Sequence, residues 1–94
     1  MKKEIPIGPG SVVRSKAGRD QGRLFIVLSL EGEEFARVAD GDLRKVEKPK
    51  RKRIKHLRAT EEVESSLQKK LLAGQRVENH ELRASLTAFK QKEG

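Results

Sequence analysis

Apolar and polar positions alternate with a period of two through much of the first half of the chain. The clearest case is RLFIVLSL (residues 23–30), where Leu24, Ile26 and the later leucines share one face while Phe25 and Val27 share the other. The run is rich in β-forming residues and only eight residues long, which favours a strand over a helix.

Shorter apolar segments of similar composition predict further strands. They lie at residues 12–13, 35–39 and 43–46, with Ile54 and Leu57 as a short fifth strand or turn. Asp40-Gly41 predicts a type I′ hairpin turn, because both residues tolerate positive φ. Four to five short strands joined by tight turns predict a mainly β fold, a small and strongly bent barrel.

The period becomes helical after residue 59. Thr60 is a predicted N-cap followed by acidic residues, Val63, Leu67 and Leu71 repeat every four residues, and Gly74 ends the segment.

Asn79 is the predicted cap of a second helix, in which Leu82, Leu86 and Phe89 share one face. Two short α-helices of this kind are unstable alone in water. Each must bury its apolar stripe against the other, the barrel or a partner.

These patterns divide the chain into a flexible N-terminal arm (1–9), a β-barrel (10–58) and a helical C-terminal appendage (59–94). The charge follows the same division. Residues 1–58 hold 16 Lys or Arg and 8 Asp or Glu, whereas residues 59–94 hold 6 of each, so the whole net charge of +8 belongs to the first part. Two regions with two roles are the simplest interpretation, and we expect the neutral tail to be separable from a charge-driven site.

Several kinds of chemistry are not expected. The chain has no cysteine, and His56 and His80 lie far apart in sequence, so neither a disulfide nor a zinc site is predicted. Acidic residues gather in turns with no nucleophile nearby, and we interpret them as solvated: Glu31, Glu33, Glu34, Asp40 and Asp42. We therefore expect no catalytic residues, no metal and no cofactor.

The N-terminal segment MKKEIPIGPG has no apolar core of the kind that a signal peptide needs. No stretch approaches the roughly 20 apolar residues of a membrane span. We expect a cytoplasmic protein without a membrane partner.

The most basic segment is Lys48 to Arg58 (KPKRKRIKHLR), with seven Lys or Arg and no acid. Such a ridge attracts a polyanion, and a phosphate backbone is the obvious one. The alternative is a solvated face, the usual fate of charge runs. A nuclear-localisation signal also fits the composition.

A glycine loop precedes the main apolar strand. Gly18 and Gly22 permit a tight turn, and Lys16, Arg19 and Arg23 lie where they could reach phosphates. An ordinary turn with solvated charges is the open alternative.

The stretch GSVVRSKAGRDQGRLFIVLSL resembles the KOW motif, with Gly22 where that family's most regular glycine lies. With the later KPKRKRIKHL, the resemblance covers about residues 8–60 and extends to the KOW-bearing large-subunit ribosomal proteins of archaea and eukaryotes and their small bacterial relatives. It implies an SH3-like barrel that binds structured RNA, often ribosomal, without catalysis. KOW motifs also occur in transcription factors and in protein-binding modules.

The candidate RNA-binding residues are cations of the loop and of the basic segment, together with one histidine. They are Arg14, Lys16, Arg19, Arg23, Lys48, Lys50, Arg51, Lys52, Arg53, Lys55, His56 and Arg58. His56 could contact RNA, or its ring could pack at the end of the barrel with a hydrogen bond to the backbone. Phe25, Phe35 and Phe89 sit in apolar patterns and are predicted core residues, so no aromatic platform remains for single strands. Folded or double-stranded RNA, ribosomal RNA included, is the expected partner, and charge alone leaves DNA as an open alternative.

A different class of function competes with this one. The barrel and the helical tail could dock a protein, which would make the chain an interaction adaptor of the translation or transcription machinery. A membrane-surface role is disfavoured, because the basic run has no large apolar residues interleaved for insertion.

Overall fold

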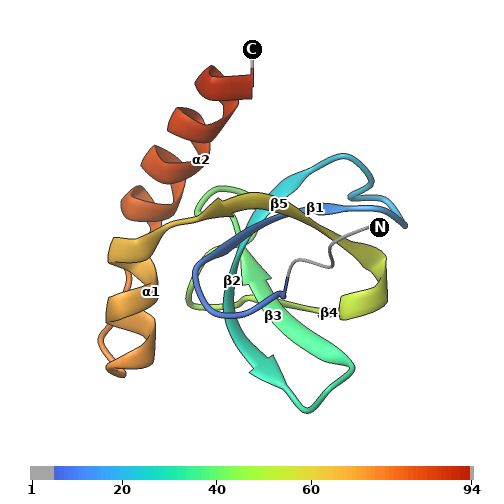
Figure 1. The fold of residues 1–94 in the computed structure, drawn as a ribbon, viewed down its shortest axis with the longest axis horizontal. Helices are drawn as coiled ribbons and strands as arrows, with labels where there is room; N and C mark the ends of the chain where they lie inside the picture. The colour runs from blue at the N-terminus through green and yellow to red at the C-terminus, as the bar shows by residue number, and fades with distance from the viewer. Residues whose placement is uncertain (1–5, 94) are drawn as a thin grey trace.

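The computed structural model describes residues 6–93, which build a bent, five-stranded antiparallel sheet with two helices packed against it (Figure 1). The elements in chain order are β1 (Ser11–Ser15), β2 (Leu24–Glu31), β3 (Phe35–Ala39), β4 (Lys50–Arg53), the 3-10 turn η1 (Ile54–His56), β5 (Leu57–Val63), α1 (Ser65–Leu72) and α2 (Asn79–Glu93). The strand order in the sheet is β4-β3-β2-β1-β5, so β4 and β5 are its edges. A mainly β fold followed by two helices is therefore confirmed.

The central strands are buried on both faces, as the alternation in the sequence predicts. One face, inside the bend, carries an inner cluster: Val13, Phe25, Val27, Ala36, Val38 and Leu57. The opposite face of the same strands carries Val12, Leu24, Ile26 and Ala39, which belong to a second, outer cluster. Irregular pairing within the β1–β5 and β2–β3 ladders accompanies the bend of the sheet.

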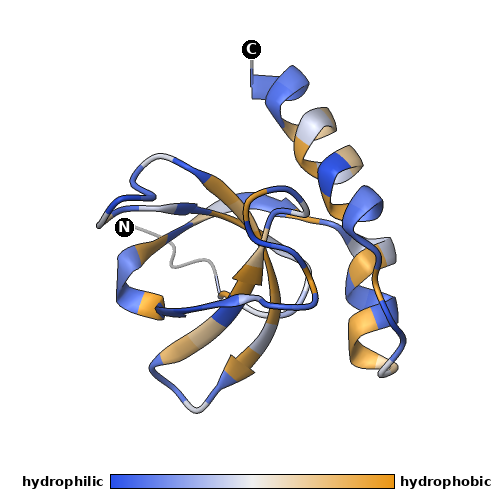
Figure 2. Ribbon diagram, turned by 180° about the vertical axis from the view of Figure 1, so that it is seen from behind, coloured by the Kyte–Doolittle hydropathy of each residue, from blue (hydrophilic) through white to orange (hydrophobic). Residues whose placement is uncertain are grey.

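The two helices complete the outer cluster. Leu67 of α1, Val77 of the connection and Leu82 and Leu86 of α2 are all buried against the sheet. Figure 2 shows the apolar positions concentrated in the strands and along the helices, while the loops are mostly polar. The helical part is thus a cover for the sheet, and its amphipathic stripes need no other partner to be buried.

Two glycines allow the helices to come this close. A side chain at Gly10, where φ is +88°, would meet Cβ of Gln68 in α1 at 2.8 Å. A side chain at Gly41, where φ is +80°, would collide with the carbonyl oxygen of Asn79. At both positions glycine satisfies a backbone conformation and a steric limit together.

The predicted hairpin at Asp40-Gly41 is wrong. Only glycines have positive φ among the described residues, so Asp40 cannot take its part in a type I′ turn. Its carboxylate instead accepts hydrogen bonds from the N–H groups of Asp42 (2.9 Å) and Arg44 (2.8 Å). Residues 43–46 are consequently a loop and not a strand, and Leu43 is 68% exposed.

The predicted start of the first helix is also wrong. Thr60 lies in β5, where its hydroxyl donates to the carbonyl of Val12 at 2.7 Å instead of capping a helix. Strand β5 continues to Val63, and α1 begins at Ser65. The predicted domain boundary after residue 58 therefore falls inside a strand that pairs with β1.

The predicted cap of the second helix, Asn79, is the first residue of α2, and its neighbour Glu78 makes the capping contact. The N–H of Glu78 donates to the carboxylate of Glu81 at 2.8 Å, as in a capping box. Asn79 instead accepts from the N–H of Val46 and donates to Glu47, which ties the loop before β4 to α2. Gly74, with φ at +74°, follows the end of α1 as predicted.

Residues 1–5 of the predicted N-terminal arm lie outside the described residues. Within residues 6–9, Ile7 packs against the inner cluster and the N–H of Gly8 donates to the hydroxyl of Ser11 at 3.0 Å.

The apolar stripes of the helical tail are buried against the sheet, which is one of the alternatives that the sequence left open. Leu82 is fully buried in the outer cluster, so Leu82→Ala should lower the free energy of unfolding by about 2–5 kcal/mol. Leu72→Ala is the matched control, because Leu72 is 69% exposed on α1 and its loss should change stability by less than about 0.5 kcal/mol. Urea denaturation followed by circular dichroism measures both. Equal, small effects would contradict the role of α2 as a cover.

Candidate nucleic-acid interface

The most basic part of the chain is an edge strand. Residues 50–53 form β4 and pair with β3, so their side chains alternate between the two faces. Lys52 points inward and is only 9% exposed, whereas Arg51 and Arg53 are exposed. The prediction that all cations of the basic segment form a solvent-facing ridge is therefore wrong for Lys52.

Lys52 is held by the glycine loop. Its Nζ donates to the hydroxyl of Ser15 at 2.6 Å and to the carbonyl of Ala17 at 3.4 Å, and lies 3.6 Å from the carboxylate of Asp20. Burial lowers the pKa of Lys52, and the charge of Asp20 opposes that effect. A buried ammonium without such partners would be costly, so these contacts fix the loop against β4.

Asp20 connects the loop to β4 a second time. Its carboxylate pairs with Lys50, and this hydrogen bond is the main reason why the pKa of Asp20 lies below its ordinary value. Lys50 and Lys52 thus serve to position the glycine loop.

The two arginines of β4 also have internal partners. The guanidinium groups of Arg51 and Arg53 lie 3.8 Å and 5.0 Å from the centre of the Phe35 ring. Arg51 pairs with Glu31 at 2.9 Å and Arg53 with Glu34 at 3.7 Å. Phe35 is therefore half-buried beneath two cations, whereas the sequence pattern predicted a core residue. Every cation of β4 has a carboxylate partner.

The loop itself is shaped by its glycines. Gly18 and Gly22 have φ of +79° and +88°, and the N–H of Gly22 donates to the carbonyl of Ser15 at 2.8 Å. Open space surrounds both positions, so glycine is required there for its backbone conformation alone. This geometry leaves Lys16 and Arg19 exposed, with no carboxylate partner among the described residues.

The loop meets the start of β5. The N–H of Lys16 donates to the carbonyl of His56 at 2.8 Å, which brings η1 beside the end of β1. Arg58 stands opposite Arg14 in the β1–β5 ladder. In Figure 1 the glycine loop and η1 lie near each other, to the right of the sheet.

We call four exposed cations around this meeting point the junction cations: Lys16, Arg19, Lys55 and Arg58. Within residues 6–93 none of them has a carboxylate within ion-pair distance. Lys48, in the loop before β4, is also exposed, with no carboxylate partner in the part of the chain that the structure describes. His56 is half-buried, and in the described part of the chain its ring makes no hydrogen bond to the backbone.

The remaining predicted residues, Arg14 and Arg23, turn toward α2. Arg14 pairs with Glu93 at 2.8 Å and also donates to the carbonyl of Gly22. Arg23 pairs at 3.0 Å with Asp40. Asp40 is buried, whereas the sequence analysis interpreted it as a solvated turn residue.

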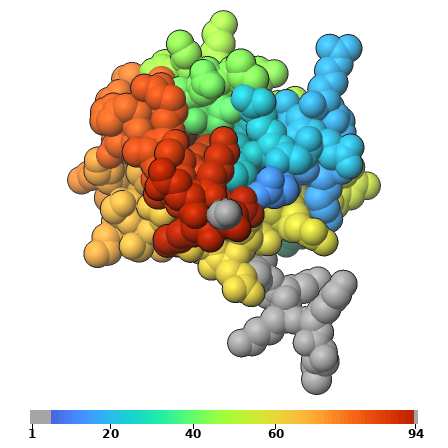
Figure 3. Space-filling view, turned by 90° about the horizontal axis from the view of Figure 1, so that it is seen from above, coloured from blue at the N-terminus to red at the C-terminus, as the bar shows by residue number. Residues whose placement is uncertain are grey.

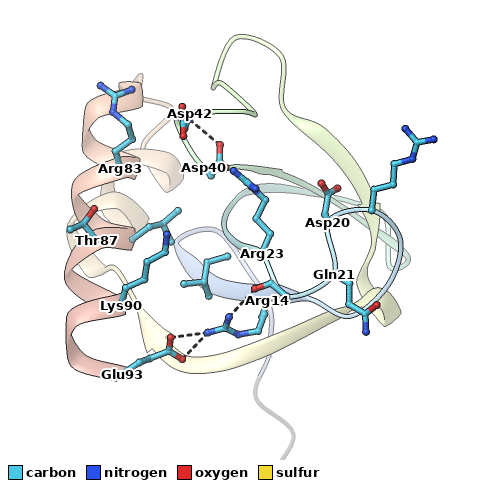
Figure 4. A pocket seen from close by; sticks show the side chains of 14 residues that line it. Arg14, Asp20, Gln21, Arg23, Asp40, Asp42, Arg83, Thr87, Lys90 and Glu93 are labelled. Carbon is cyan, nitrogen blue, oxygen red and sulfur yellow. Dashed lines mark hydrogen bonds and ion pairs between the residues drawn. The ribbon is translucent and has the colours of Figure 1, made fainter.

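These two arginines line a cavity of about 590 Å³ between the glycine loop and α2 (Figure 4). Arg83 and Lys90 of α2 line the same cavity. The sequence pattern missed both, because the summed charge of the tail is zero. Their spacing of seven residues, beside the apolar stripe of the same helix, is the signal that could have found them.

Other functional groups are few in residues 6–93. No cluster of three or more histidine or acidic side chains in this range could hold a metal ion. None of the helices within it is long and apolar enough to cross a membrane.

The chain matches no model of a protein family, and a search of curated protein sequences finds no match.

The buried carboxylate of Asp40 generates a prediction about pH. Burial favours its neutral form, but hydrogen bonds from Asp42 and Arg44 and the pairing with Arg23 together hold its pKa below the ordinary value. Asp40→Asn should therefore lower the free energy of unfolding at neutral pH by about 1–3 kcal/mol.

The sign of the pH dependence follows from this lowered pKa. The stabilisation is complete above the unfolded-state pKa, about 4, and is lost as pH falls through the folded-state value. The difference between wild type and Asp40→Asn should thus shrink below about pH 4. Urea denaturation over a pH series measures it, with the exposed Asp42→Asn as control. A difference that stays constant down to about pH 3 would contradict the assignment.

Proposed function

We propose that this chain is a non-catalytic RNA-binding protein of the KOW type, acting in the cytoplasm on structured RNA such as ribosomal RNA. The observation that carries the proposal is the group of junction cations, which are exposed and free of carboxylate partners within residues 6–93. Unneutralised cations gathered at one end of a sheet attract a polyanion more strongly than a ridge of internal ion pairs does.

The same proposal includes the fold type. The order β4-β3-β2-β1-β5, the bulged pairing and the strong bend support an SH3-like barrel, although β4 and β5 are the edges of an open sheet. The inner cluster within the bend supports it further. The resemblance to the KOW motif rests on residues that the structure uses, since Gly22 closes the loop onto Ser15.

The proposed mechanism is electrostatic docking through phosphates. Phe25 is buried, Phe35 lies under two guanidinium groups, and Phe89 packs against the outer cluster. No aromatic ring in the described part of the chain is therefore offered for base stacking, which favours contacts to the backbone of folded or duplex RNA.

Binding should depend strongly on salt. If the four junction cations each neutralise one phosphate of a duplex, the slope of log K against log salt is about −3.6. A fourfold rise in salt would then weaken binding by about 150-fold. Fluorescence anisotropy with a labelled RNA hairpin at several salt concentrations measures the slope, and a slope near zero would rule out electrostatic docking.

The location of the site is tested by a charge-matched pair of variants. Replacing Lys16, Arg19 and Arg58 by Gln should reduce the salt slope by about three and weaken binding more than about tenfold at low salt. Replacing Lys69, Arg76 and Lys92 by Gln removes the same charge from the helical part, and these side chains are also exposed. Equal losses in the two triple variants would show that net charge drives binding, with no localised site.

An interaction adaptor remains the second candidate, because one observation favours it. An apolar groove of about 280 Å³ is lined by Leu28, Val46, Leu71 and Val77, and Leu72 of α1 is 69% exposed. Purification from cells with and without nuclease separates the two functions. An RNA-binding protein loses its companions after nuclease treatment, whereas an adaptor keeps a protein partner.

A further inference from the structure

Cations that lie far apart in the sequence come together in the groove between the glycine loop and α2. Arg14, Arg23, Arg83 and Lys90 line it together with acidic side chains, in a volume of about 590 Å³. Figure 3 shows α2 (red) lying directly beside the β1–β2 region (blue to cyan), and Figure 4 shows Lys90 on the side of α2 that faces the loop. Helix and loop therefore form the two walls of one opening.

Three of the four acidic residues that line this groove are paired, and they differ in how firmly they are bound; the fourth, Asp42, is exposed, with no cation partner within residues 6–93. Asp20 is held by Lys50, and Asp40 is buried and held by Arg23 and two backbone N–H groups. These two carboxylates are fixed parts of the fold. Glu93 is different, because its only partner among residues 6–93 is Arg14, and the side chains of Glu93 and Arg14 are 43% and 35% exposed.

The cations differ in the same way. Arg83 donates to the carbonyl of Gly41 at 2.6 Å and so helps to hold the loop that follows β3. Lys90 is exposed and has no carboxylate partner among residues 6–93. Arg14 donates to the carbonyl of Gly22, and its carboxylate partner within residues 6–93 is Glu93, in an exposed ion pair that contributes little to stability and can be exchanged.

We propose that this groove binds a phosphate of the RNA backbone, with Lys90 and Arg14 as its ligands and Glu93 as the counter-ion that the phosphate displaces. This inference rests on the proposed RNA binding and extends it to α2. A phosphate accepts two hydrogen bonds from a guanidinium as a carboxylate does, so Arg14 can exchange one for the other. The groove also lies next to the junction cations, because Arg14, which lines it, stands opposite Arg58 in the β1–β5 ladder.

The first test is a substitution on α2 with a control two residues away. Lys90→Gln should weaken binding of a labelled RNA hairpin on the order of fivefold and reduce the salt slope by about one. Lys92→Gln removes the same charge from the same helix, but Lys92 pairs with Glu62 instead of lining the groove. Its binding should stay close to that of the wild type.

The second test has the opposite sign. Glu93→Gln removes the competing carboxylate, so it should tighten RNA binding on the order of threefold. Glu33→Gln is the control, since this exposed residue lies in the β2–β3 turn and does not line the groove. Both tests use the whole chain, and thermal unfolding of each variant shows that the fold is intact.

The outcomes separate this inference from the proposed function. Weaker binding for Lys90→Gln and tighter binding for Glu93→Gln, beyond their controls, would support the groove. If the wild type binds RNA with the expected salt slope but each variant matches its control, the groove is overturned and the junction cations remain as the site. A wild type that binds RNA without salt dependence would overturn both.

Discussion

The structure depends on one constraint, which is that β1 and β2 are apolar on both faces. A strand of this kind cannot lie at the surface of a small antiparallel sheet, because either exposed face would leave several large side chains in water. The bend of the sheet encloses Phe25 and Val27 on the inner face, but bending cannot cover Leu24 and Ile26. The two helices meet that need. Each Leu buried there contributes about 1.5–3 kcal/mol, so the helices are part of the fold although the charge pattern sets them apart.

The same constraint determines where charged groups can meet. Because α2 must lie over Leu24 and Ile26, its length runs beside the loop that precedes them. Arg14, near the end of β1, thereby reaches Glu93 at the far end of the chain. Helix α2 therefore both covers the apolar face of the sheet and forms one wall of a charged groove. Packing decides the position of the groove, and the sequence then decides which side chains face it.

The sequence predicted the parts of the fold that local periodicity controls. The alternation in β2 predicted both faces correctly up to Val27, and the apolar stripe of α2 was assigned correctly through Leu82 and Leu86. After Val27 a register shift places Leu30 opposite Ala36 of the inner cluster, so Leu30 does not share the face of Leu24 and Ile26 as the pattern predicted. It failed where a tertiary contact overrides a local signal. Thr60 before a run of acids is a good helix start by itself, yet pairing with β1 uses residues 57–63 as a strand. The loop after β3 was misjudged because the Asp40 side chain replaces the second strand of a hairpin as partner for the backbone.

For the candidate site, the sequence located the charge but could not separate paired from unpaired cations. Lys is almost never fully buried unless it is paired, so nothing along the chain marked Lys52 as an inward side chain. The partner Asp20 lies 32 positions earlier, and only the folded sheet brings the two together.

The charge of β4 also has a function that does not involve a ligand. β4 is an edge strand, and lysine and arginine on an edge discourage pairing with another chain. An ion pair such as Arg51–Glu31 produces a field that falls off faster with distance than that of a lone cation, and salt shortens the range of both. An approaching polyanion therefore responds mainly to the cations that folding leaves unpaired. For this reason the proposed binding surface is better identified by removing the internal ion pairs from the count than by finding the densest run of Lys and Arg in the sequence.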